Sequence, residues 1–119
     1  QADGGTRTAS ISGAWVALRL AVNGLLKSGD ITQDPIPAKV AAISCGVYQG
    51  TPVLDLDYPE DSNADADANF VLIEGGKIAE AQATAEGAPY DEEAFLRLLR
   101  LAQMGCAQIF KAQDEATRK

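Results

Sequence analysis

The chain has 119 residues, of which 46% are hydrophobic and 23% are charged, a composition typical of one globular domain. It contains no histidine, which excludes an imidazole base or metal ligand within this chain. The formal net charge of −7 argues against nucleic-acid binding by this chain alone, because such surfaces are basic. No run approaches about 20 apolar residues and the opening residues are polar, so we expect no membrane span and no signal peptide.

The first predicted element is a helix, which follows a glycine-rich opening segment over residues 1–8 and continues to about Lys27. Its apolar residues recur at the spacing of one helical stripe, and we expect that stripe to face the core: Ile11, Trp15, Leu18, Val22 and Leu25. Gly29 and Asp30 end this helix. Two prolines within residues 32–37 then predict a loop.

Four strands and a second helix are predicted in the rest of the chain. The strands cover residues 38–48, 53–57, 68–73 and 78–85, with tight turns at 49–50 and 74–77. The final helix has Asp91 as its N-cap and a clear amphipathic stripe: Phe95, Leu98, Leu99, Ala102, Cys106, Ile109 and Phe110. The order helix, four strands, helix indicates an α+β fold, in which a layer of helices packs against a largely antiparallel sheet.

The two cysteines fall in apolar patterns, Cys45 in a predicted strand and Cys106 on the stripe of the last helix. We therefore expect two reduced thiols in the core of a cytosolic protein.

A candidate phosphate site lies in residues 3–8, Asp-Gly-Gly-Thr-Arg-Thr, directly before the predicted first helix. Glycines let the backbone approach a ligand closely, and free N–H groups at a helix start attract anions. The Arg7 guanidinium suits phosphate oxygens. The segment lacks the end of a Walker loop, so these residues alone leave open both phosphate binding and a structural glycine turn.

A second candidate is the acidic segment 55–67, which joins two predicted strands. Clustered carboxylates are neutralised well by a hard divalent cation such as Mg²⁺. A solvated acidic loop is the more common outcome of this composition. A weaker candidate is Glu86, at the end of the last predicted strand.

Three blocks of the sequence, taken together, resemble the ribonuclease PH family. They are residues 1–14, residues 57–62 with 66–69, and residues 82–87, and their order and spacing agree over essentially the whole chain. The resemblance implies a fold of the ribosomal protein S5 domain 2-like type. It also implies that residues 1–119 are the C-terminal half of a single ribonuclease PH domain, normally built into a hexameric ring.

The resemblance further implies roles for individual residues. Gly5, Thr6 and Arg7 would hold an attacking inorganic phosphate. Asp61 and Asp67 would hold Mg²⁺ or Mn²⁺, and Asp67 would take part in proton transfer to the leaving 3′ oxygen. The implied enzyme is a cytoplasmic, phosphate-dependent 3′-5′ exoribonuclease that trims transfer RNA precursors and some ribosomal RNA, releasing nucleoside diphosphates.

The family's N-terminal half supplies further strands, another phosphate-contacting arginine and the basic residues that bind RNA, which would explain the acidic balance of this chain. We therefore expect this chain to work in complex with that half as a separate chain. Two alternatives remain: a non-catalytic ring subunit like those of the exosome core, and a phosphate- or nucleotide-binding module. The presence of Arg7, Asp61 and Asp67 favours the enzyme.

Overall fold

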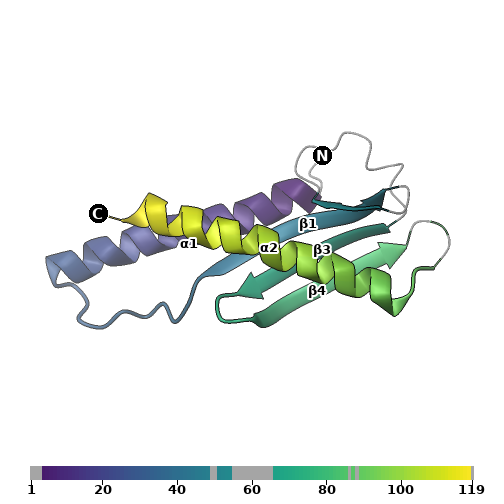
Figure 1. Cartoon of the computed structure of the whole chain (residues 1–119). Helices are drawn as coiled ribbons and strands as arrows, with labels where there is room; N and C mark the ends of the chain where they lie inside the picture. Colours follow the sequence, from purple (N-terminus) through teal and green to yellow (C-terminus); the bar gives the residue numbers. More distant parts are fainter. Residues whose placement is uncertain (1–3, 49–50, 55–65, 86, 88, 119) are drawn as a thin grey trace.

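The computed structural model describes residues 4–48, 51–54, 66–85, 87 and 89–118. Within these ranges, two helices and four strands follow one another in the predicted order (Figure 1). The elements are α1 (Gly4–Ser28), β1 (Val40–Tyr48), β2 (Thr51–Leu54), β3 (Ala66–Ile73), β4 (Lys77–Ala85) and α2 (Glu92–Thr117). The predicted α+β class is confirmed.

The strands form one antiparallel sheet in the order β2-β1-β3-β4. β1 is paired along Val40–Val47 with β3, but only its last four residues are paired with β2. The turn between β3 and β4 contains Gly75 and Gly76 at φ angles of +99° and +90°, a conformation that glycine adopts without steric cost. The predicted turn at residues 49–50 lies outside the described residues.

The main core lies between the sheet and α2, on the side of the sheet that we call the α2 face. Alternate residues of β1 and β3 point to this face and pack against one stripe of the helix: Ala41, Ile43, Cys45, Ala68, Phe70, Leu72, Leu98, Ala102 and Cys106. The Phe70 and Phe95 rings lie 5.9 Å apart at their centroids. Asp91 caps α2 by accepting a hydrogen bond from the Ala94 N–H at 2.9 Å. The predicted stripe and N-cap of α2 are confirmed.

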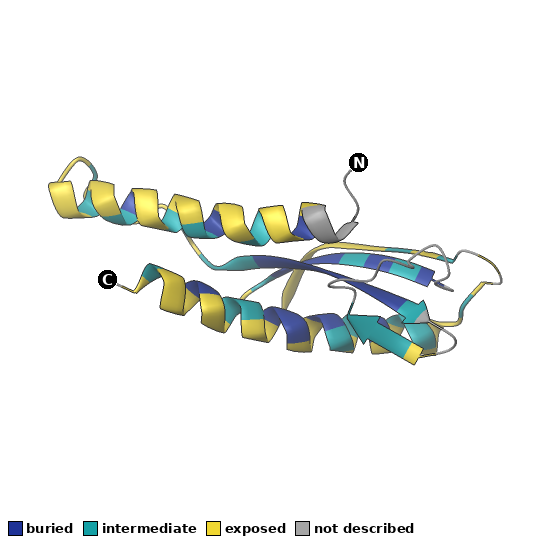
Figure 2. Ribbon diagram, turned by 90° about the horizontal axis from the view of Figure 1, so that it is seen from above, coloured by how far each residue is buried: buried dark blue, intermediate teal, exposed yellow. Residues whose placement is uncertain are grey.

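α1 lies on the other side of β1 from α2 (Figure 2), and we call this side of the sheet the α1 face. The sequence predicted a single layer of helices. Instead, the two helices lie on opposite sides of β1. The expected stripe is also wrong in part: Trp15 and Val22 are buried, whereas Leu18 and Leu25 are 53% and 42% exposed. The physical reason is that α1 contacts the sheet almost entirely at β1, so its buried strip is narrow and includes the polar Thr8.

β1 extends beyond the short β2, and side chains bond to the backbone along this length. The Trp15 Nε1–H donates to the Ala38 carbonyl at 3.0 Å. The Ala42 N–H donates to Ser12 Oγ at 3.0 Å. The Gln113 amide of α2 donates to the Val40 carbonyl at 2.9 Å and to the Ser12 carbonyl at 3.1 Å. α1 and α2 therefore meet along this edge of β1.

The expectation that no segment is long and apolar enough to span a membrane is wrong for α1. Residues 7–28 meet that criterion by length and composition alone, because alanine and leucine are dense along a helix with few charges. Very little of this segment is buried within the described chain. The expectation that both cysteines are unpaired core thiols is confirmed, since Cys45 and Cys106 are buried and free.

Candidate functional site

The α1 face carries polar side chains where the α2 face carries apolar ones. Residues of β1, β3 and β4 that lie side by side form three rows across it: Gly46–Asp67–Thr84, Ser44–Asn69–Gln82 and Ala42–Val71–Glu80. α1 covers this face at β1 and scarcely reaches β3, so the side chains of β4 are exposed. The described chain therefore presents an open polar surface beside the first turns of α1.

Arg7 reaches over this surface from the start of α1. Its Nη2 atom lies 3.8 Å from Glu80 Oε2 on β4, and the two side chains are 47% and 44% exposed. α1 sits over β1, and Glu80 lies on the outer strand β4. The Arg7 side chain therefore extends across β3, the strand between them, to reach Glu80. This places a fixed positive charge above β3.

Asp67 lies on β3 and points to the same face. A side chain at Gly46, its partner on β1, would approach Asp67 Oδ1 to 3.7 Å and the Ala66 carbonyl to 3.1 Å. The missing side chain at Gly46 thus leaves room beside the carboxylate. Asp67 is half-buried, so the residue is partly exposed at this face.

A line of hydrogen-bonding groups joins the start of α1 to β3. Thr8 Oγ1 lies 3.3 Å from Ser44 Oγ, and the Ser44 hydroxyl donates to Asn69 Oδ1 at 2.7 Å. Thr8 and Ser44 are only 3% and 4% exposed. Ser44 and Glu80 were not predicted from the sequence, whereas Thr8 lies in the predicted phosphate segment 3–8 and Asn69 in the block 66–69 that carries the family resemblance. For Ser44 and Asn69, the available signal was a polar residue within a largely apolar strand.

Gly5, Thr6 and Arg7 belong to the first turns of α1, whereas the sequence predicted a loop before the helix. The first N–H groups of a helix have no partner within it, and the anion site stays a prediction. The structure brings Arg7 and Asp67 to one face. Asp61 and Glu86 lie outside the described residues.

Asp67 is the described carboxylate that could contribute to holding a magnesium ion bound partly by substrate. Among the residues that the structure describes, no three or more His, Cys, Asp or Glu side chains lie close enough together to hold a metal ion. Mg²⁺ seldom needs such a cage, since it is commonly held by one or two carboxylates together with substrate phosphates and water. The Asp67 carboxylate on an open face fits that mode of binding.

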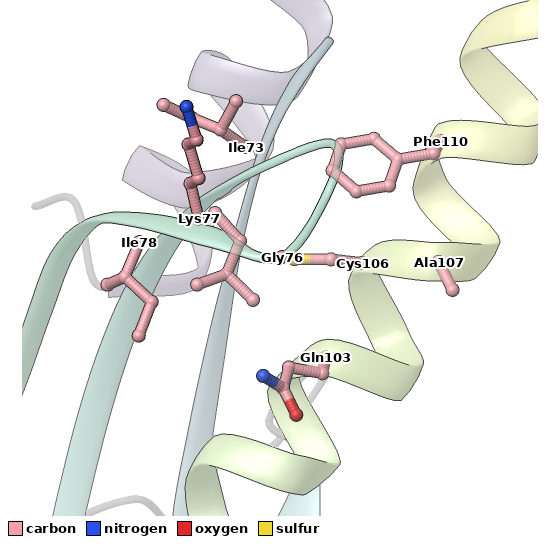
Figure 3. Close-up of a pocket in the computed structure, with 9 residues that line it drawn as sticks. Ile73, Gly76, Lys77, Ile78, Gln103, Cys106, Ala107 and Phe110 are labelled. Carbon is pink, nitrogen blue, oxygen red and sulfur yellow. The ribbon is translucent and has the colours of Figure 1, made fainter.

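A cavity of about 180 Å³ lies on the α2 face, away from these residues. Figure 3 shows Cys106 and Phe110 of α2 facing Gly76 and Ile78 of the β3–β4 hairpin across it. Burial raises the pKa of the Cys106 thiol to about 11, so this sulfur is an unreactive part of the core. None of the predicted site residues lines this cavity.

A second, open hollow lies beside Trp15 and Arg19 of α1 and is lined by a group of ion-paired side chains. Lys39 Nζ lies 2.6 Å from Asp114 Oδ2 and 3.2 Å from Glu74 Oε2. The hydrogen bond that Lys39 donates to Asp114, and to a lesser extent the one to Glu74, raises the pKa of Lys39. These pairs tie the start of β1 to the ends of β3 and α2, which is a structural role.

The elements and the polar face define an α+β domain in which a helix start and a strand carboxylate share one open surface. The model of the 3′ exoribonuclease family, domain 2, matches residues 39–105, more than half of the chain. The chain belongs to this family. The fold is accordingly of the ribosomal protein S5 domain 2-like type, as the resemblance implied.

Curated relatives carry the name ribonuclease PH. The chain is 54% identical over 117 residues to the protein from Roseobacter denitrificans, and 58% identical over 116 residues to those from Cereibacter sphaeroides and Methylobacterium sp.. Each match covers 98% of this chain and 49% of the relative. The resemblance found in the sequence is confirmed, and the chain spans about half the length of these relatives.

Proposed function

We propose that this chain is the C-terminal half of a phosphate-dependent 3′-5′ exoribonuclease. The observation that carries the proposal is that Arg7, at the start of α1, and Asp67, on β3, share one open polar face. A cation beside free helix N–H groups suits inorganic phosphate, and a carboxylate on the same face of the sheet suits proton transfer. The names of the relatives support the same reaction class.

In the proposed reaction, an oxygen of inorganic phosphate attacks the phosphorus of the last phosphodiester bond of the RNA. The bond from that phosphorus to the 3′ oxygen of the preceding nucleotide breaks, which releases a nucleoside diphosphate and an RNA one nucleotide shorter. Arg7 and the N–H groups at Gly5 and Thr6 hold the phosphate and offset its charge. Asp67 takes the proton of the attacking hydrogen phosphate and passes it to the leaving 3′ oxygen.

We propose Mg²⁺ or Mn²⁺ as the cofactor, held by Asp67 together with Asp61. Such an ion would offset the negative charge that gathers as two anions approach. The oxygen chemistry of the Asp67 carboxylate is compatible with either ion.

We further propose that the partners are an N-terminal half of the same protein, RNA, and further copies in a hexameric ring in the cytoplasm. The exposed leucines of α1 (Leu18, Leu20 and Leu25) support a covering partner. The net charge of −7 supports RNA-binding cations on that partner rather than on this chain. The free buried thiols agree with a reducing compartment. Precursors of transfer RNA are the proposed main substrates.

The principal alternative is a non-catalytic ring subunit, as found in the exosome core. Retention of both Arg7 and Asp67 on one face favours the enzyme over that alternative. A phosphate- or nucleotide-binding module without RNA chemistry would use Arg7 but would have no need of Asp67.

The test is phosphate-dependent release of nucleoside diphosphates from a transfer RNA precursor, using this chain assembled with its N-terminal half. We expect release that requires phosphate and a divalent cation. Arg7→Ala and Asp67→Ala should each reduce the rate by about 10²- to 10³-fold. Arg100→Ala removes an exposed arginine from α2, so it controls for loss of charge and should leave the rate unchanged. An assembled complex that binds RNA but releases no diphosphate would identify a non-catalytic subunit.

A further inference from the structure

The hydroxyl of Ser44 sits where a strand this apolar would be expected to carry an alanine or a valine. Its neighbours Ile43 and Cys45 are core residues of the α2 face, and Ser44 itself is 4% exposed on the α1 face. Burying a hydroxyl costs free energy unless it is hydrogen-bonded, and the bonded state returns little net stability. The bonds of Ser44 therefore serve to fix a geometry more than to stabilise the fold.

The geometry that Ser44 fixes joins two separate elements of the proposed site. On one side it lies 3.3 Å from Thr8, the neighbour of Arg7 in α1. On the other side it donates to Asn69 at 2.7 Å, and Asn69 is also its partner in the pairing of β1 with β3. Asn69 and Asp67 are two residues apart on one strand, so they share a face at roughly 7 Å.

This connection matters because α1 makes few other contacts with β3. The helix that carries Arg7 rests on β1, while Asp67 belongs to the next strand. Phosphate held by Arg7 must meet a proton-transfer group on Asp67, and a misplacement of about 1 Å in such an arrangement can cost about 100-fold in rate. A short, buried hydrogen-bonded line is suited to hold that distance.

We propose that Ser44 is a positioning residue, which through Thr8 and Asn69 sets the placement of Arg7 relative to Asp67. This inference rests on the proposed function. Ser44 touches neither the substrate nor the reacting atoms, and its effect on the rate is exerted through Asp67. Removal of its hydroxyl leaves the contacts between Arg7 and phosphate intact but lets the start of α1 shift relative to β3, so bound phosphate is misaligned with the Asp67 carboxylate.

The test measures kcat and the KM for phosphate in the assembled protein at saturating RNA, together with thermal unfolding. We expect Ser44→Ala to lower kcat by about 10- to 100-fold, with the KM for phosphate changed less than threefold. Thr8→Val should do the same, whereas Thr8→Ser, which keeps the hydroxyl, should restore kcat to within threefold of the parent.

A matched control is Ser12→Ala, one turn further along α1. Ser12 also links the helix to β1 through its hydroxyl, but it bonds to the Ala42 backbone and does not lead to β3. It should lower the unfolding temperature at least as much as Ser44→Ala while leaving kcat within twofold of the parent. A kcat loss for Ser12→Ala equal to that for Ser44→Ala would make the role merely structural and overturn the proposal.

The deciding measurement combines Ser44→Ala with Asp67→Ala. If Ser44 acts through Asp67, its removal in the Asp67→Ala background should cost less than threefold, so that the two changes are not additive. An equal fold-loss in both backgrounds would overturn the positioning role while leaving the proposed enzyme intact. A parent protein that releases no diphosphate would overturn both proposals at once, which separates the two failures.

Discussion

The two faces of the sheet are built from alternate residues of the same strands, but they use different interactions. On the α2 face, Ile43 and Phe70 pack into a continuous apolar core. On the α1 face, Ser44 and Asn69 occupy the adjacent positions and form hydrogen bonds. Two adjacent residues of β1 thus differ in kind: Ile43 packs into the apolar core, and Ser44 makes a directional hydrogen bond.

The contrast indicates a division of labour within one sheet. Apolar contacts are non-directional and tolerate small shifts, so they suit the face that holds the molecule together. Hydrogen bonds fix distances between particular atoms, so they suit the face that carries Arg7 and Asp67. Substitutions on the α2 face should therefore change stability, and those on the α1 face should change reaction parameters.

The largest effect on stability is expected for Phe70→Ala. Phe70 is fully buried between the sheet and α2, and truncation of such a residue costs about 3–5 kcal/mol in transfer and cavity terms. Urea unfolding of the assembled protein measures this change. Gln82→Ala, an exposed position on β4, is the control, expected within about 0.5 kcal/mol of the parent. A loss below 1 kcal/mol for Phe70→Ala would contradict the assignment of the core.

A smaller loss is expected for Gly105→Ala. A side chain at Gly105 would collide with Ile43 and meet Leu54 at 3.3 Å, and such overpacking costs about 1–3 kcal/mol. Gly24→Ala in the exposed part of α1 is the matched control. Its side chain would meet nothing within 4 Å, so it should stabilise by about 0.5–1 kcal/mol through helix propensity. The same sign for both would contradict the packing of α2 on β1.

The pH dependence of stability sharpens the comparison further. The pKa of Cys106 is raised to about 11 from an ordinary value of 9.0 because the thiol is buried. The folded state therefore keeps a proton that the unfolded state loses, and this contribution is present in full below pH 9 and lost as the pH rises toward 11. We expect a fall of about 1–2 kcal/mol in the free energy of unfolding across that range.

Cys106→Ala is the control for this pH effect. It lowers stability at every pH but should remove the part of the slope between pH 9 and 11 that belongs to the thiol. An unchanged slope in this variant would assign the pH effect to other groups, such as Lys39.

The smallest effect is expected for Glu80→Gln. Glu80 lies 3.8 Å from Arg7, and both are about half exposed, so their interaction is worth at most about 1 kcal/mol. Loss of this competing anion should lower the KM for phosphate by about two- to fivefold at low salt, with kcat unchanged. The difference should shrink as the ionic strength rises. A raised KM would instead mean that Glu80 holds Arg7 in the binding position.

The sequence predicts the elements of this fold well where their signal is local. The 3.6-residue periodicity and the Asp91 cap define α2, and the glycines at 75 and 76 define a hairpin. The burial of α1 is not local information. Leu18 and Leu25 repeat at helical spacing with Trp15, but which of them is buried depends on how narrowly the helix rests on β1. The spacing of apolar residues alone therefore cannot predict which of them contact β1.

The candidate site divides in the same way. Arg7 and Asp67 were found through the residue types near them and through a family resemblance. Ser44, Asn69 and Glu80 become relevant only when strand register places them on one face. Register depends on the pairing of segments distant in the chain, which single-residue patterns do not specify.

The side chains along the first half of β1 have a consequence for how the sheet can grow. Bare strand edges are templates on which any extended segment can add a new strand. Here Ser12 and Gln113 already bond to the backbone groups of Ala42 and Val40, so these groups are not available to an added strand. Side chains of the two helices thus block strand addition at this part of the β1 edge, which protects it from misassembly. The outer strand β4 remains open to pairing.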